Sequence, residues 1–137
     1  MQVTAIIAEW NPLHRGHLLP VQAARQQGAT HIVAILSGNF VQRGEPALCP
    51  WQYRAAAALS SGVDLVLLLP LPYAVSTAQH FAGGAVASLA ALGAVDSLIF
   101  GSECGELAAL RSVAAALDSP DLPAALAPHL QKGLPFA

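Results

Sequence analysis

Four short apolar runs along the chain have the length of β-strands, and each leads into a segment that contains Gly, Pro, Asn or Ser. They cover residues 3–8, 31–36, 64–69 and 97–100. Three segments of helical character separate them, at about residues 16–27, 50–61 and 78–92. Strands that alternate with helices in this rhythm indicate βαβ units, which build a parallel sheet through right-handed crossovers. The pattern therefore predicts an α/β fold in which helices flank a parallel sheet.

The pattern changes after Gly101. Residues 106–117 are rich in Ala and Leu and predict a helix, and Pro120, Pro123 and Pro128 then separate one or two shorter helices. We therefore predict two parts, an α/β domain at residues 1–104 and a helical extension at residues 105–137.

The composition supports a largely buried sheet. Of the 137 residues, 55% are hydrophobic and only 10% are charged, as expected for parallel strands that are covered on both faces. The formal net charge is −2 and Lys132 is the only lysine, so the chain lacks the basic stripe of a nucleic-acid-binding domain. If a tRNA is a substrate, we expect most of its backbone contacts to come from elsewhere.

The sequence favours a protein that neither enters a membrane nor is exported. Its amino terminus lacks the basic region and the long apolar stretch of a signal peptide. The longest apolar run, residues 63–72, includes Asp64 and two prolines and is too short to span a bilayer. We expect a cytoplasmic protein, and the sequence leaves its oligomeric state open.

The most informative residues follow the first predicted strand. His14-Arg15-Gly16-His17 forms an HxGH tetrad at the start of the first predicted helix, shortly after Asn11-Pro12. The carboxyl end of a parallel strand opens onto the crevice where α/β sheets bind ligands, and the following helix offers free N–H groups to phosphate. Gly16 would let a nucleotide approach the backbone, because no Cβ is in the way.

The two histidines fit a catalytic role in adenylyl transfer. His14 and His17 lie three residues apart and share one face of a helical turn, where both can donate hydrogen bonds to phosphate oxygens as charge develops. Histidines at this spacing also occur often as surface residues or helix caps without a catalytic role, but the position after the first strand favours catalysis. No third side chain that could bind a metal lies at a characteristic sequence spacing from the two histidines, so we predict no metal site made by the protein. Any Mg²⁺ would be held mainly by a triphosphate and water.

Several blocks of the sequence resemble one family. Residues 8–17, AEWNPLHRGH, resemble the HIGH-type signature of the nucleotidyltransferase superfamily, and residues 37–46, SGNFVQRGEP, resemble a block of the tRNA(Met) cytidine acetate ligase family. Further blocks follow in the same order, among them GVDLV at 62–66, YAV at 73–75 and FGSECG at 100–105. The resemblance covers essentially the whole chain, and it implies a Rossmann-like nucleotidyltransferase fold of the HUP type.

The resemblance also implies a reaction. In that family, ATP and acetate give acetyl-adenylate and pyrophosphate, and the acetyl group then passes to N4 of the wobble cytidine of elongator tRNA(Met). His14 and His17 lie within the matching HIGH-type signature, and we expect them to be the catalytic residues. The residues that match the family's ATP contacts are Ile7, Ala8, Glu9, Trp10, Asn11, Pro12, Leu13, His14, Arg15, Gly16, His17, Leu18, Leu19, Pro20 and Gly101. Family members are much longer, so we expect this chain to be an amino-terminal part, with the remaining nucleotide contacts and most tRNA contacts beyond Ala137.

Polar residues in the later loops each allow two interpretations. Arg43 follows the second strand and could bind a phosphate or the acetate, because Arg suits bidentate recognition of oxyanions; it could equally pair with Glu45 or cap the helix near Pro50. Asn39 could contact the substrate or serve only its own backbone. Glu103 could contact ribose or Mg²⁺, or it could cap the next helix.

Two other functions stay open at this level. One is a different HxGH enzyme that adenylylates a phosphorylated coenzyme precursor. Its second phosphate would need a basic pocket, which Arg15, Arg25, Arg43 and Arg54 could only partly supply. The other is a catalytically inactive fragment that binds nucleotide.

Overall fold

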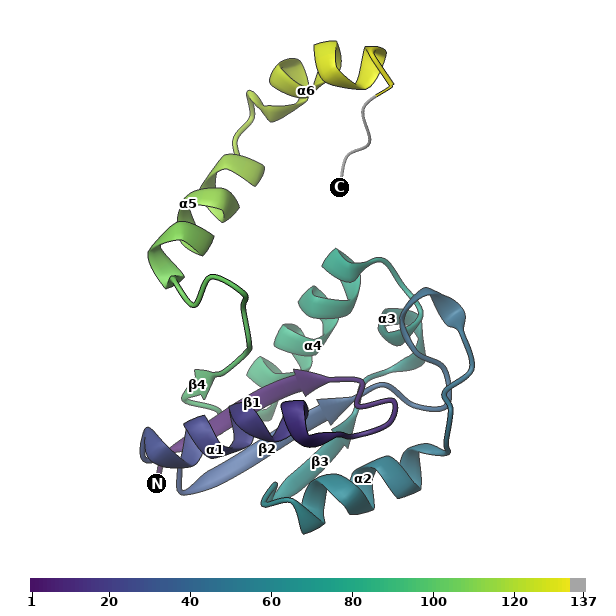
Figure 1. Ribbon diagram of the computed structural model, residues 1–137, viewed down its shortest axis with the longest axis vertical. Helices are drawn as coiled ribbons and strands as arrows, with labels where there is room; N and C mark the ends of the chain where they lie inside the picture. Colours follow the sequence, from purple (N-terminus) through teal and green to yellow (C-terminus); the bar gives the residue numbers. More distant parts are fainter. Residues whose placement is uncertain (134–137) are drawn as a thin grey trace. The chain divides into compact units, whose positions relative to one another are not determined.

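The first compact unit of the chain is built around a parallel sheet (Figure 1). A computed structural model describes residues 1–133 and divides the chain into the units Met1–Phe100 and Gly101–Ala137. The strands of the first unit are, in chain order, β1 (Val3–Ala8), β2 (His31–Leu36), β3 (Leu65–Leu68) and β4 (Ser97–Leu98). All neighbours pair in parallel, in the order β3-β2-β1-β4. The predicted α/β class is therefore confirmed.

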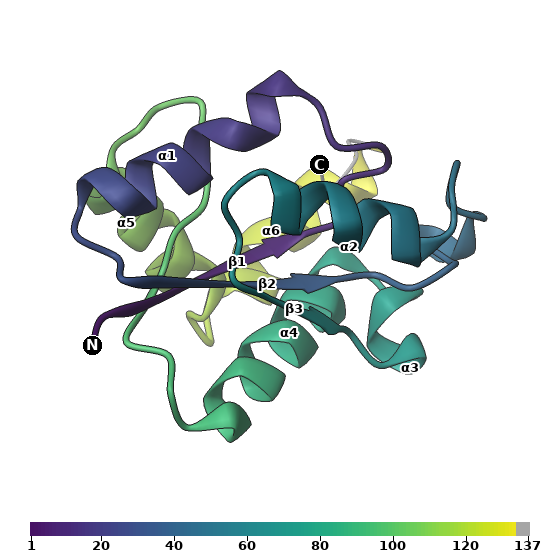
Figure 2. The same cartoon turned by 90° about the horizontal axis from the view of Figure 1, so that it is seen from below.

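Helices cover both faces of this sheet. Helices α1 (Leu18–Gln26) and α2 (Trp51–Ser60) lie on one face, and α4 (Ala78–Leu92) lies on the other, as Figure 2 shows. Each pair of consecutive strands is thus joined by a helical connection that packs on one face of the sheet, which is the arrangement that the alternating pattern predicts.

Two apolar clusters hold the layers together. One is centred on Ile6, Ile32 and Leu36 and packs against α1 and α2, and the other is centred on Val33 and Ile35 and packs against α4. Neighbouring residues of β2 thus point to opposite faces, and both faces are buried. This explains why the strand reads as an unbroken apolar run.

The elements differ from their predicted bounds mainly at the sheet edges. Strands β1 and β2 match the prediction, whereas β3 covers only Leu65–Leu68 and β4 only Ser97–Leu98. The first predicted helix begins with a 3₁₀ turn, Arg15–His17, before α1 starts at Leu18. A further short helix, α3 (Leu71–Ala74), follows β3 and was not predicted.

Side chains fix the amino-terminal ends of the strands. Asp64 accepts a hydrogen bond from the Ile32 amide at 2.6 Å, and Asp96 accepts one from the Val3 amide at 2.7 Å. The Arg25 guanidinium donates to the carbonyls of Ala29, Thr30 and Gly62 and to the Asp64 carboxylate, which lies 2.7 Å away. The two aspartates are therefore parts of the strand connections.

The second unit is helical. It contains α5 (Leu107–Leu117) and α6 (Leu122–Gln131), and no residue of either helix is buried. The predicted extension covers 105–137, of which residues 134–137 lie outside the described part; its boundary at residue 104 stays a prediction. Between residues 1 and 133, no helix is both long and apolar enough to cross a bilayer.

Candidate nucleotide-binding site

The loop after β1 carries the HxGH residues. It leaves the strand at Glu9, passes through Trp10 and a cis Asn11-Pro12 peptide, and enters the 3₁₀ turn Arg15–His17. Trp10 has a φ of 44° and is only 4% exposed. A non-glycine residue in the left-handed region costs about 1–2 kcal/mol. The surrounding contacts must therefore hold this conformation.

The two histidine rings are stacked and their hydrogen bonds define their tautomers. Their centroids lie 3.6 Å apart. His14 Nδ1 accepts a hydrogen bond from the Gly16 amide at 3.1 Å, and His17 Nδ1 accepts one from the His14 amide at 3.2 Å. Because each Nδ1 is an acceptor, each neutral ring carries its proton on Nε2. Both histidines therefore keep one N–H donor for a ligand.

His17 favours the neutral form. Burial lowers the pKa of His17, and the charge of His14 lowers it further. Two stacked imidazolium rings would repel each other, and a proton on Nδ1 of His17 would also remove the acceptor of the His14 amide. His17 therefore favours donating its hydrogen bond from a neutral ring.

Gly16 also leaves space for a neighbouring side chain. A Cβ at this position would lie 3.1 Å from Cε1 and 3.3 Å from Nδ1 of His14. The missing side chain thus makes room for the His14 ring over the turn. Close approach of a nucleotide at Gly16 stays a prediction.

A pocket of about 550 Å³ joins this loop to the loop after β2. Its size is typical of small-molecule sites. It lies at the carboxyl ends of the strands, where α/β sheets bind ligands. The lining residues are Ile7, Ala8, Glu9, Trp10, Asn11, His17, Val41, Gln42 and Glu45.

Two side chains of the first loop bind the backbone of the second. The Glu9 carboxylate accepts a hydrogen bond from the Gln42 amide at 2.6 Å, and Asn11 Oδ1 accepts one from the Leu48 amide at 2.7 Å. These bonds set the position of the SGNFVQRGEP block against the HxGH loop. The block therefore forms one wall of the pocket.

Asn39 and Arg43 have different surroundings within that block. Asn39 Oδ1 accepts a hydrogen bond from the Trp51 amide at 3.3 Å, at the start of α2. Arg43 is exposed, has a φ of 69°, and lines a separate pocket of about 420 Å³ with Ser76 and Thr77. In residues 1–133 the only ion pair is Arg25–Asp64, so Arg43 does not pair with Glu45.

Arg54 is a buried cation that the sequence suggested only as one of four arginines for a second phosphate pocket. It lies in α2 and is 1% exposed. Its guanidinium donates to the carbonyls of Glu9 at 2.6 Å, of Cys49 at 3.3 Å and of Gly38, and it contacts Ser37 Oγ at 3.4 Å. Sequence pattern alone cannot distinguish it from a solvent-exposed helical arginine.

Arg54 stays charged in this environment. Burial lowers the pKa of Arg54, while the nearby Cys49 and Glu9 raise it. Arginine starts far above neutral pH, so the charge is retained. Hydrogen bonds to a charged group contribute about 1.5–3 kcal/mol each. The three bonds from Arg54 to carbonyls together therefore exceed the cost of the left-handed Trp10 conformation.

The remaining candidate residues lie in four places. Leu13 packs against the core cluster of α1 and α2, and Leu18, Leu19 and Pro20 form the first turn of α1. Arg15 is exposed in the 3₁₀ turn. Gly101 and Glu103 belong to the second unit, where Glu106, not Glu103, occupies the N-cap position of α5.

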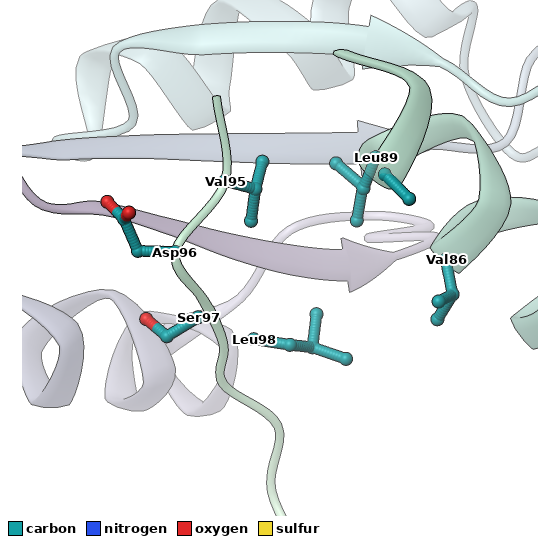
Figure 3. A pocket seen from close by; sticks show the side chains of 7 residues that line it. Val86, Leu89, Val95, Asp96, Ser97 and Leu98 are labelled. Atoms are coloured by element: carbon teal, nitrogen blue, oxygen red, sulfur yellow. The ribbon is translucent and has the colours of Figure 1, made fainter. Parts of the chain in front are cut away.

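An apolar pocket lies at the edge of the sheet, away from the histidines. It measures about 220 Å³ and is lined by residues of α4 and of the β4 segment, including Val86, Leu89, Val95 and Leu98 (Figure 3). It offers no cation to a phosphate. Within residues 1–133 there is no cluster of three or more His, Cys, Asp or Glu side chains that could hold a metal ion.

The fold and the site together define a class of protein. A parallel α/β sheet carries an HxGH turn after its first strand, and the turn borders a pocket at the carboxyl ends of the strands. This arrangement is that of a nucleotide-binding domain of the nucleotidyltransferase type. The profile of the HIGH Nucleotidyl Transferase family matches residues 1–137, and the chain belongs to this family.

Known relatives are longer than this chain. The tRNA(Met) cytidine acetate ligase of Caldanaerobacter subterraneus subsp. tengcongensis is 48% identical over 100% of this chain and 35% of its own length. That of Exiguobacterium sibiricum is 55% identical over 78% of this chain and 28% of its own length. The crystal structure of Thermotoga maritima TmcAL with bound alpha-thio ATP is 41% identical, with a TM-score of 0.89 over 99% of this chain and 34% of that one. The chain thus spans about a third of these relatives.

Proposed function

We propose that the pocket beside the HxGH turn binds ATP, and that the chain supplies the nucleotide-activating part of a tRNA(Met) cytidine acetate ligase. The observation that carries this proposal is the histidine pair. Both rings are fixed with Nδ1 turned to the backbone and Nε2–H free. Two preset donors at the carboxyl end of a strand suit the developing charge of a phosphate that is being displaced.

The surroundings of the pair fit a nucleotide. The amino terminus of α1 follows the turn directly, and the positive end of its helix dipole favours a phosphate. The candidate ATP contacts from Ile7 to Pro20 surround the turn, and six of the nine residues that line the pocket belong to this segment. Gly101 is proposed as a further contact, and Asn39 and Arg43 as contacts of a phosphate or of the second substrate.

The acetate, the tRNA and the metal ion belong to the same proposal. The relatives are named as tRNA(Met) cytidine acetate ligases, and the net charge of −2 agrees with tRNA contacts made largely by other regions. Mg²⁺ would arrive with the triphosphate and be held by its oxygens and water. We propose the cytoplasm as the compartment.

The site supports a coenzyme-precursor adenylyltransferase less well. That function needs a second phosphate site, and two of the four candidate arginines are already engaged. Arg25 pairs with Asp64 at the opposite end of the strands, and Arg54 is buried against backbone carbonyls. Arg15 and Arg43 are the two that stay exposed.

Calorimetric titration of a non-hydrolysable ATP analogue into the chain tests the proposal. We expect binding in the wild-type chain and a Kd at least about tenfold higher in a His14→Ala, His17→Ala double variant, because a hydrogen bond to a charged group contributes about 1.5–3 kcal/mol. His129→Ala, an exposed histidine of α6, is the matched control and should bind like the wild type.

Two outcomes would contradict the proposal. Equal affinity in the double variant would place the nucleotide elsewhere, and no binding by a folded wild-type chain would show that these residues do not hold a nucleotide by themselves. Acetate-dependent exchange of label between pyrophosphate and ATP, measured on a protein that carries this sequence at the length of its relatives, tests the second substrate. Exchange that proceeds equally without acetate would contradict acetate as the second substrate.

A further inference from the structure

Arg54 contacts the three backbone segments that surround the candidate site. Its Nη1 donates to the Glu9 carbonyl at 2.6 Å, and its Nη2 donates to the Gly38 carbonyl. Its Nε donates to the Cys49 carbonyl at 3.3 Å, just before α2. One side chain therefore connects the loop after β1, the loop after β2 and the start of α2.

The bond to Glu9 acts on the histidine turn through Trp10. The Glu9 carbonyl belongs to the peptide group that precedes Trp10, and rotation of this group would relieve the left-handed φ of 44°. Arg54 opposes that rotation by holding the carbonyl. Trp10 is buried, and its ring centroid lies 6.4 Å from that of His17. A change at Glu9 would thus displace the surface on which His17 rests.

The bond to Gly38 acts on the opposite wall of the pocket. Gly38 precedes the segment whose Gln42 amide donates to the Glu9 carboxylate at 2.6 Å. Arg54 and Glu9 therefore hold the second loop at two points, one at its start and one at the pocket. Both walls of the pocket depend on the same guanidinium.

We propose that Arg54 is a positioning residue of the HxGH site, which sets the orientation of the His14–His17 pair through the Glu9–Trp10 peptide. The planar fork of arginine suits this task, because it presents several donors in fixed directions to acceptors on different segments. A lysine could donate to one or two of these carbonyls but could not join all three segments. The effect on the orientation of the histidines is independent of any ligand, whereas the effect on the affinity for ATP rests on the proposed function.

Arg25 provides a matched control in the same unit. It also donates to three backbone carbonyls, those of Ala29, Thr30 and Gly62, at 2.8–3.0 Å. It does so at the amino-terminal ends of the strands, at the end of the sheet opposite to the histidines. Changes at Arg25 and Arg54 should therefore both affect stability, and only changes at Arg54 should affect the site.

The test compares Arg54→Lys and Arg54→Met with Arg25→Lys and Arg25→Met. Nitrogen-15 NMR of the imidazole rings reports the tautomers of His14 and His17 without any ligand, and titration with an ATP analogue reports affinity. We expect all four variants to have a lower Tm. We expect only the Arg54 variants to lose the pure Nε2–H tautomers and to bind the analogue at least about tenfold more weakly.

Several outcomes would overturn the proposal. Unchanged ring signals in folded Arg54 variants would show that Arg54 does not orient the histidines. Equal changes of the ring signals in the Arg25 variants would show a general effect of destabilisation. If Arg54→Met fails to fold, Arg54→Lys decides. If Arg54→Lys also fails to fold where Arg25→Lys folds, Arg54 supports the whole unit and not the site in particular. Absence of ATP binding in the wild type would contradict the proposed function alone, because the tautomer comparison remains.

Discussion

The imidazole rings of the HxGH turn are oriented by their own backbone. The His14 ring accepts a hydrogen bond from the Gly16 amide, and the His17 ring accepts one from the His14 amide. The two residues together therefore cap the 3₁₀ turn reciprocally. This capping role and a catalytic role do not exclude each other. The capping bonds use Nδ1 on both rings, and therefore the same bonds that cap the turn leave Nε2–H available.

A pH dependence of stability follows from His17. Its pKa in the folded chain is lowered by burial and by His14, relative to 6.5 for the unperturbed side chain. Below about pH 6.5, His17 binds a proton in the unfolded chain more readily than in the folded chain. The free energy of unfolding should therefore fall as the pH is lowered from 7.5 to 5. Urea denaturation of the wild type and of His17→Gln over this range measures the difference.

Two comparisons decide this pH prediction. His129→Gln should retain the wild-type slope, because His129 is an exposed residue of α6. Asp64 cannot produce the effect. Although burial would raise the pKa of Asp64, its bonds from Ile32 and Arg25 lower it below the usual 3.8, so its stabilisation is lost only in more acid solution. An unchanged slope in His17→Gln would contradict the prediction.

Site residues differed in how far the sequence could predict them. The HxGH tetrad was evident because its position after a strand and its glycine are both visible in the pattern. Arg54 was not, since its importance comes from burial against carbonyls of segments that are distant in sequence. Gly16 was predicted for its missing side chain, but the structure shows the His14 ring in that space.

At the scale of the elements, Gly84 determines how α4 packs. A Cβ on Gly84 would overlap the Tyr73 ring of the short helix α3, whereas a Cβ on Gly83 would have no described atom within 4 Å. The two glycines are neighbours in the same helix but face different surroundings: Gly84 is buried and Gly83 is exposed. The Tyr73 ring of α3 therefore lies close to α4 because position 84 has no side chain.

The two glycines predict opposite effects of alanine. Gly84→Ala should lower the free energy of unfolding by about 1–3 kcal/mol, because overpacking forces side chains or backbone to move. Gly83→Ala should raise it by about 0.5–1 kcal/mol, because alanine favours the helix and meets no clash. Urea denaturation of both variants measures the contrast. Equal stability of the two variants would contradict the close packing of Tyr73.

The long elements could be predicted and the short ones could not. Strands β1 and β2 are buried on both faces and read as apolar runs, and α4 is long enough to show its periodicity. Helix α3 has four residues, too few for a period, and it follows the apolar β3 without a polar break. Strand β4 is an edge strand, so its end depends on pairing with only one neighbour.

At the scale of the whole molecule, the two units differ in how much they bury. In the first unit, Ile32, Ile35 and Leu36 are almost completely buried. In the second, α5 exposes Leu107, Val113 and Leu117 by half or more of their surface. A helix without a buried face has little beyond its intrinsic propensity to stabilise it.

Hydrogen exchange should separate the two units. We expect the amides of α5 to exchange at least about a hundredfold faster than those of β2, because local opening of an uncovered helix costs little free energy and the core strand opens only with the whole unit. Mass spectrometry of peptides from both segments measures this difference. Equal protection of α5 and β2 would show that α5 is covered in solution.

Charged side chains are unevenly distributed between the two ends of the strands in the first unit. At the amino-terminal ends Arg25 pairs with Asp64, and Asp96 adds a second carboxylate; at the carboxyl-terminal ends, Arg15, Arg43 and Arg54 outnumber Glu9 and Glu45. An approaching anion is thus turned toward the histidine end before it makes any contact, although the chain as a whole is acidic. Such steering acts on the association rate and weakens with ionic strength. Selection could therefore tune how fast an anion arrives by changing surface charges, without touching the residues that hold it.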